Sequence, residues 1–223
     1  MTWHPDIPLE YRNQIVTGDA RELAKRIPDE SIDLIFTDPV YDRIEDYEWL
    51  AKTAARVLKP DSTCLAWIAN PRIETVLRVM GRYLSFVMPF VYTVPGKGYM
   101  MFSRTTFVWS TLCLWFEKGK SRKTGAKPDT VVGGGRTAFG HKWNKNPDAF
   151  INWASIFPGI VFDPFTGGGT VPAVCKILGR NYIAFEIDPE TADLARERVL
   201  NTQPPLFVPE PEQLELRNTQ EPE

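Results

Sequence analysis

The stretch that most constrains the fold of this chain is residues 160–170, with the sequence IVFDPFTGGGT. Its first three apolar residues predict a short buried strand, and Asp163 stands where that strand ends. The three consecutive glycines predict a tight turn, and Thr170 opens a stretch whose apolar residues recur at helical spacing. Strand, glycine turn and helix in this order are typical of the mononucleotide-binding half of a doubly wound α/β sheet.

A second strand, residues 182–185, ends at Glu186, which follows Gly167 by 19 residues. A carboxylate at this distance, at the tip of the next strand, is placed to accept both hydrogen bonds from a ribose diol. The consecutive glycines lack the spaced Gly-x-Gly-x-x-Gly pattern of dinucleotide folds. The stretch therefore predicts a site for a nucleoside without a pyrophosphate, although the glycines alone would also fit a tight turn that binds nothing.

A third strand, residues 32–37, lies far upstream and ends in Asp38-Pro39-Val40-Tyr41. These four residues resemble the Asp-Pro-Pro-Tyr signature of amino-methyltransferases, and residues 163–170 resemble the S-adenosylmethionine loop of the same enzymes. From about residue 15 to residue 200, the chain resembles the DNA adenine-N6 and cytosine-N4 methyltransferases. Its catalytic motif precedes its cofactor loop, as in the permuted beta class of that family.

The resemblance implies a Rossmann-like methyltransferase fold: an α/β protein with a mostly parallel twisted sheet, helices on both faces and an antiparallel hairpin at one edge. It also implies S-adenosylmethionine as cofactor, DNA as substrate, and a family in which homodimers and restriction-modification partners occur. The expected catalytic residues are Asp38, Pro39 and Tyr41, with Val40 against the substrate. The expected cofactor residues are Asp19, Ala20, Asp163, Phe165, Gly167, Gly169, Thr170 and Glu186.

The chemistry of amine methylation explains the catalytic residue types. The lone pair of an exocyclic base amine is delocalised into the ring, so the enzyme must localise it and accept a proton. The Asp38 carboxylate and the Pro39 carbonyl can each accept one N–H, which stabilises the positive charge that grows on nitrogen. Tyr41 offers an aromatic face to a base rotated out of the duplex.

Adenine is favoured over cytosine because the motif begins with Asp38, whereas cytosine-N4 members of the family more often begin with Ser. Val40 departs from the signature, which has a second proline there. Both acceptors come from Asp38 and Pro39, so we expect activity to be retained. Three alternatives stay open: an N4-cytosine DNA methyltransferase, an RNA or small-molecule methyltransferase, and a catalytically weak module that binds cofactor and nucleic acid.

Two further motifs can each be explained by a structural role as well as by a functional one. Asp19, in a Gly-Asp-Ala segment, is placed to cap the helix that follows, and in the resembling family this acid reaches the cofactor adenine. Residues 141–147 resemble a family segment that precedes the cofactor strand, with Asn146 inserted before the proline. Simple packing of Trp143 explains that segment equally well.

Residues 117–147 are basic and glycine-rich, with eight basic and two acidic residues and a net charge of +6. They fit either a solvated loop or a segment that contacts DNA phosphates. Together with residues 95–106, at the tip of a hairpin formed by 85–94 and 107–116, they are the expected recognition insertions. The candidate DNA contacts are Lys118, Lys120, Arg122, Lys123 and Arg136.

Composition fits one ordinary globular domain: 223 residues, 43% hydrophobic, 24% charged, with a net charge of −2. We expect a methyltransferase domain over residues 1–202 and a disordered acidic, proline-rich tail over 203–223. Three dispersed cysteines predict buried free thiols and a cytoplasmic protein. No apolar run predicts a membrane span, and with only two histidines, His4 and His141, no zinc site is expected.

Overall fold

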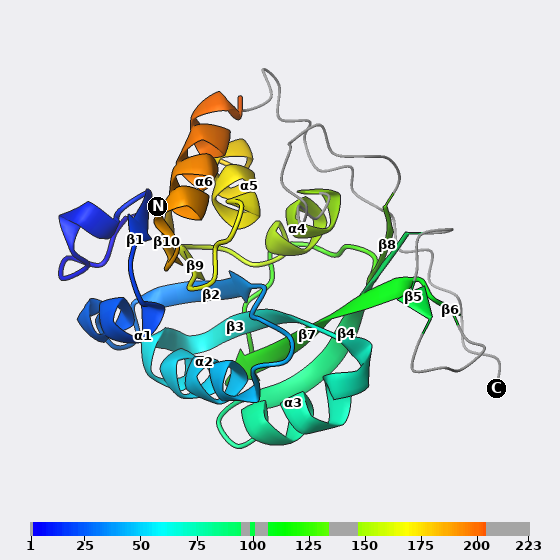
Figure 1. Ribbon diagram of the computed structural model, residues 1–223. Helices are drawn as coiled ribbons and strands as arrows, with labels where there is room; N and C mark the ends of the chain where they lie inside the picture. Colours follow the sequence, from blue (N-terminus) through cyan, green and yellow to red (C-terminus); the bar gives the residue numbers. More distant parts are fainter. Residues whose placement is uncertain (1, 95–98, 101–106, 134–146, 204–223) are drawn as a thin grey trace.

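The computed structural model describes residues 2–94, 99–100, 107–133 and 147–203 (Figure 1). An eight-stranded sheet with the order β1-β10-β9-β2-β3-β7-β4-β8 forms its centre, and β5 and β6 form a separate two-stranded ribbon. The strands are β1 (Gln14–Thr17), β2 (Ile32–Thr37), β3 (Leu58–Ile68), β4 (Ser85–Thr93), β5 (Tyr99–Met100), β6 (Phe107–Val108), β7 (Ser110–Lys118), β8 (Thr130–Val132), β9 (Val161–Asp163) and β10 (Tyr182–Glu186). The α-helices are α1 (Ala20–Leu23), α2 (Ile44–Val57), α3 (Ile73–Met80), α4 (Pro147–Ala154), α5 (Thr170–Ile177) and α6 (Pro189–Asn201).

The direction of the strands fixes where the loops gather. β1, β10, β9, β2 and β3 run parallel, while β7 is antiparallel to both of its neighbours, β3 and β4. The parallel strands therefore all end on one side, here named the carboxyl end of the sheet, and begin at the opposite amino end. β2 and β9 are neighbours although about 120 residues separate them, which is the permuted order that the motifs predicted.

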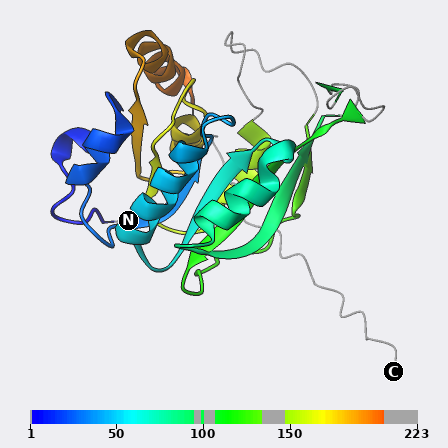
Figure 2. The same cartoon turned by 60° about the horizontal axis from the view of Figure 1, so that its bottom comes forward.

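Helices cover both faces of the sheet (Figures 1 and 2). Helices α1, α2 and α3 pack on one face through a core that includes Tyr47, Leu50 and Phe116. Helices α4, α5 and α6 pack on the other through Trp67, Phe150 and Trp153. Alternating residues of the central strands supply both cores, because successive side chains of a strand point to opposite faces. The predicted fold class is confirmed.

β3 is long, because it begins at Leu58 and its pairing with β2 continues across a shift of register between Ile32 and Leu34. Two other features were not expected from the sequence. β8 lies inside the basic segment, where Thr130 pairs with Val91 of β4. The hairpin of β4 and β7 is consequently not at the very edge of the sheet, since β8 lies outside it.

Cys64, Cys113 and Cys175 are buried free thiols, as predicted. In the part of the chain that the structure describes, every helix is too short or too polar to cross a membrane. The hairpin tip, Arg136, the segment 141–146 and all of the expected tail beyond residue 203 lie outside the described residues.

Candidate functional site

A cleft of about 330 Å³ opens at the carboxyl end of the sheet. The loops that follow β1, β2, β9 and β10 form its walls, together with the start of α2. Brought together there are Gly18, Asp19, Ala20, Arg21, Asp38, Val40, Arg43, Glu45, Asp46, Pro164, Phe165, Gly167, Phe185, Glu186 and Ile187. Residues up to 169 positions apart, Gly18 and Ile187, thus meet because parallel strands end on the same side, which is where ligands bind in open α/β sheets.

Asp19 has the helix-capping role that its sequence predicted. Its carboxylate accepts a hydrogen bond of 2.8 Å from the Arg21 amide, at the first turn of α1. The preceding residue, Gly18, donates its amide to the Glu186 carbonyl at 2.8 Å and so ties the ends of β1 and β10 together. Asp19 also lines the cleft, so the same side chain can cap α1 and contact a ligand.

Glu186 is held in place by the turn it faces. Its carboxylate accepts one hydrogen bond from the Gly167 amide, at 2.8 Å, and another from the Asp188 amide, at 3.0 Å. These two backbone donors fix the side chain at the tip of β10, on the wall of the cleft. A carboxylate keeps further acceptor positions when two are used, so Glu186 can still accept from a ligand hydroxyl.

The structure gives Asp163 a structural role, while its expected contact with the cofactor stays a prediction. It is 2% exposed and does not line the cleft. Its Oδ1 accepts hydrogen bonds from the Thr37 hydroxyl at 2.7 Å and from the Phe165 amide at 3.2 Å, which joins the ends of β2 and β9. Burial raises the pKa of Asp163 from its ordinary 3.8 to about 7, against the lowering effect of these hydrogen bonds.

This raised pKa predicts a pH-dependent stability. The folded protein binds the Asp163 proton more tightly than the unfolded chain does, so stability falls as pH rises from about 4 to 7. Asn keeps the Oδ1 acceptor without the charge. We expect Asp163→Asn to raise stability by at most about 4 kcal/mol at pH 8 and by less than about half of that at pH 5. Urea unfolding at both pH values measures this, and a difference that does not change with pH would contradict it.

Gly169 and Thr170 also have structural roles, and their expected cofactor contacts stay predictions. Gly169 has a φ of +74°, and a Cβ there would lie 2.9 Å from the Ala195 Cβ of α6. The Thr170 hydroxyl accepts a hydrogen bond of 2.8 Å from Arg198, which also donates to the Gly168 carbonyl at 2.9 Å. The turn thus packs against α6 at Gly169 and Thr170 and presents Gly167 to the cleft.

The two glycines make a matched pair for stability measurements. Gly167 also has a positive φ, +49°, but no atom lies within 4 Å of a Cβ built there. We expect Gly167→Ala to cost about 1 kcal/mol of unfolding free energy from backbone strain alone. Gly169→Ala adds a collision with α6 and is expected to cost at least about 2 kcal/mol. Urea unfolding of both variants checks this, and equal losses would show that the contact with Ala195 carries no energy.

The loop after β2 places the predicted catalytic motif in the cleft. Asp38 and Val40 line it, and Val40 is 53% exposed. Tyr41 is half-buried against the core on the α4 side, so it presents less open aromatic surface than its sequence position suggested. Burial, the charge of Asp38 and a hydrogen bond to Asp38 raise the pKa of Tyr41 above its usual range. The neutral phenol therefore helps to orient the Asp38 carboxylate.

Several cleft residues could not be picked out from the sequence. The Arg21 guanidinium and the Asp46 carboxylate form an ion pair of 2.6 Å on the wall. Ile187 is 66% exposed directly after Glu186, although it is apolar. Phe165, by contrast, was expected from the sequence, and it is held edge-on against Trp49 at 5.6 Å. The only sequence signal for Ile187 is its position after the acid at the strand tip.

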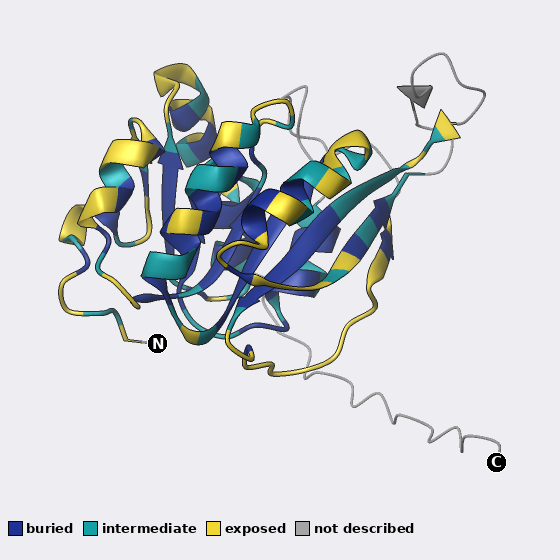
Figure 3. Ribbon diagram, turned by 90° about the horizontal axis from the view of Figure 1, so that it is seen from below, coloured by how far each residue is buried: buried dark blue, intermediate teal, exposed yellow. Residues whose placement is uncertain are grey.

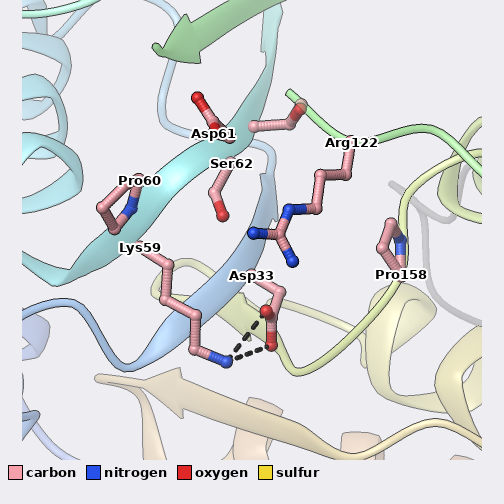
Figure 4. Close-up of a pocket in the computed structure, with 8 residues that line it drawn as sticks. Asp33, Lys59, Pro60, Asp61, Ser62, Arg122 and Pro158 are labelled. Carbon is pink, nitrogen blue, oxygen red and sulfur yellow. Dashed lines mark hydrogen bonds and ion pairs between the residues drawn. The ribbon is translucent and has the colours of Figure 1, made fainter. Parts of the chain in front are cut away.

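The basic residues that were expected to contact DNA lie at the other end of the sheet. Arg122 lines a separate cavity of about 220 Å³ where β2 and β3 begin, and Figure 4 shows its guanidinium directed toward Asp33 and Ser62, beside Lys59. Asp33 starts β2 and Asp38 follows its end, so the two are about 16 Å apart along the strand. The structure therefore does not bring Arg122 to the cleft.

The neighbouring lysines have local partners at the same amino end. Lys118 donates to the Leu58 carbonyl at 2.7 Å and pairs with Glu30 at 3.1 Å. Lys123 pairs with Glu117 at 3.5 Å, and the Lys120 amide donates to Asp61. The direction of β7 explains this correction: the antiparallel strand carries the chain away from the carboxyl end before the basic run begins.

Comparison with known families agrees with the site. A family model described as DNA methylase, named for N6 and N4 methylation, matches residues 114–197, and a methyltransferase-domain model matches residues 6–66. The type II methyltransferase M.HpaI of Haemophilus parainfluenzae is 28% identical, over 83% of this chain and 74% of its own length. The type II methyltransferase M.HinfI of Haemophilus influenzae is 26% identical, over 87% and 70%.

Solved structures share the fold. M1.HpyAVI, in its complex with SAM, superposes with a TM-score of 0.72 at 24% identity, over 84% of this chain and 98% of that one. The PvuII DNA methyltransferase, which is cytosine-N4-specific, superposes with a TM-score of 0.73 at 17% identity, over 85% and 86%.

Proposed function

We propose that the chain is an S-adenosylmethionine-dependent DNA methyltransferase of the N6-adenine and N4-cytosine family, and that it methylates the exocyclic N6 of adenine in DNA. The observation that carries this proposal is the cleft itself, because it brings Asp38 within the same cavity as Glu186 and Asp19. One cavity thus holds both an acceptor for an amine proton and acceptors for a nucleoside.

The cleft fits the cofactor. Glu186 supplies an oriented acceptor for the ribose hydroxyls, and Asp19 supplies another acceptor on the lining of the cleft. Gly167 leaves open space where a side chain would stand. Phe165 and the exposed Ile187 offer apolar surface on which an adenine ring can stack. When bound, S-adenosylmethionine supplies a methyl group that its sulfonium has already activated.

The catalytic loop performs the rest of the chemistry. The Asp38 carboxylate accepts one N–H of the target amine, and the Pro39 carbonyl accepts the other, which turns the nitrogen lone pair toward the methyl donor. The positive charge that grows on the amine is stabilised by the same two acceptors. The Tyr41 hydroxyl keeps the carboxylate oriented. Val40, exposed at the mouth of the cleft, contacts the base.

Adenine is proposed over cytosine because Asp38 begins the motif. The cytosine-N4-specific PvuII enzyme shares the fold, so N4-cytosine methylation is the second candidate. The test is mass spectrometry of nucleosides released from unmethylated DNA after incubation with the protein and S-adenosylmethionine. N6-methyl-2′-deoxyadenosine is the expected product. N4-methyl-2′-deoxycytidine in its place would favour the second candidate, and methylation of RNA alone would contradict both.

A further inference from the structure

Two aromatic side chains at the carboxyl end of the sheet, Phe107 and Trp109, are exposed and take no part in the proposed methyl transfer. Beyond the carboxyl end of the sheet, the chain continues from β4 and β7 into an arm made of Val94, Trp109 and the ribbon of β5 and β6 (Figures 1 and 3). Phe107 is 60% and Trp109 50% exposed on this arm. Their alternation along an extended chain places both on the same face. A cluster of large apolar side chains that are exposed to solvent is typical of an interaction surface.

A chain of contacts fixes the base of the arm to the catalytic loop. The Asn70 amide, just after β3, donates to the Ser110 carbonyl at 3.1 Å and to the Ser110 hydroxyl at 3.3 Å. Two residues on, the Arg72 guanidinium pairs with Asp42 at 3.3 Å, in the turn that follows Tyr41. On the other side, the Val94 amide donates to the Trp109 carbonyl at 3.0 Å. The backbone that carries Trp109 is thus positioned relative to the Asp38 loop.

The dimensions suit a duplex in the cleft. β7 lies two strands from β2 in the sheet, a lateral separation of about 10 Å. That is less than the width of a major groove, about 12 Å. Trp109 directly precedes β7, so this lateral separation is within the span of a duplex whose target base lies against Asp38. Val40, which lines the cleft, is also exposed.

We propose that Trp109, supported by Phe107, stacks on the bases that are left exposed in the duplex when the target base rotates into the cleft. Rotation of a base out of a duplex breaks its pair and its stacking. When the Trp109 indole stacks on the exposed bases, it replaces part of the lost stacking. It thereby stabilises the duplex in which the target base is rotated out. This inference rests on the proposed function, because it presupposes that the target base leaves the helix.

The experiment compares two substrates. The methylated position is first mapped by sequencing DNA modified by the wild-type protein. A duplex with that site is then compared with a duplex in which an abasic nucleotide stands opposite the target base. For Trp109→Ala, kcat/KM on the intact duplex is expected to fall about 10- to 100-fold. On the second duplex the loss is expected to be less than about threefold, because that target is already unpaired.

Two control variants test whether the loss of activity comes from the aromatic ring of Trp109. Trp109→Phe is expected to restore most of the activity, since it retains an aromatic face. Phe86→Ala removes an aromatic residue that is 43% exposed at the start of β4, at the other end of the sheet, and is expected to change nothing. Equal losses of Trp109→Ala on both duplexes, or no loss on either, would overturn the inference. No methylation by the wild-type protein on any DNA would instead overturn the proposed function.

Discussion

Replacing Asp38 with Ala is expected to lower the turnover of methyl transfer by about 10²- to 10⁴-fold, while the affinity for S-adenosylmethionine changes by less than about threefold. The carboxylate lines the cleft and is oriented by Tyr41, so its removal takes away the main acceptor for the amine proton. The acceptors for the cofactor, Asp19 and Glu186, stay in place. Single-turnover transfer of labelled methyl, with cofactor affinity from calorimetry, measures both quantities.

A surface acid provides the control for Asp38. Glu48→Ala removes a carboxylate on α2 that pairs with Lys52 at 2.7 Å, away from the cleft lining, and is expected to keep full activity. A normal single-turnover rate in Asp38→Ala would show that methyl transfer does not require this carboxylate. A loss of cofactor affinity as large as the loss of rate would mean that Asp38 supports binding rather than chemistry.

Replacing Glu186 with Ala is expected to weaken S-adenosylmethionine binding by about 10- to 100-fold, with little change of turnover at saturating cofactor. The carboxylate is held by the Gly167 and Asp188 amides on the cleft wall, where it can accept ribose hydroxyls. Removing it deletes charge-assisted hydrogen bonds to the ligand and leaves Asp38 in place. Calorimetry with S-adenosylmethionine and with the demethylated product S-adenosylhomocysteine gives the two dissociation constants.

Asp188 is the matched control for Glu186, because it is an acid two residues away that does not line the cleft. Its carboxylate caps α6 by accepting from the Thr191 amide at 2.9 Å. Asp188→Ala is therefore expected to cost about 1 kcal/mol of stability and to leave cofactor affinity unchanged. If both variants lost affinity equally, the effect would come from the loop and not from the Glu186 carboxylate.

The sequence predicted the strands and turns that carry the site, because their signals are local. The apolar run before Asp163, the glycines after it, and the acid at the tip of β10 each reflect a requirement of the backbone within a few residues. The position of Asp38 in the cleft could be expected from the same logic, since parallel strands share a carboxyl end.

The sequence could not predict the roles that depend on distant parts of the chain. Asp163 matches the motif, but only the structure shows that its carboxylate accepts a hydrogen bond from Thr37 on a different strand. Only the structure shows that a Cβ at Gly169 would lie close to Ala195 on α6. The position of the segment 118–123 at the amino end of the sheet could not be predicted either, because the antiparallel direction of β7 is set by its pairing with β3 and β4.

The central claim is that the cleft joins a methyl donor to a base amine held by Asp38. It is tested most directly by incubating the purified protein with S-adenosylmethionine labelled in its methyl group and with unmethylated duplex DNA, and then measuring the label in the DNA. The account predicts label that accumulates with time, resides in N6-methyl-2′-deoxyadenosine after digestion, and accumulates at least about 100-fold more slowly with Asp38→Ala. Saturable cofactor binding without any label in the DNA would contradict it.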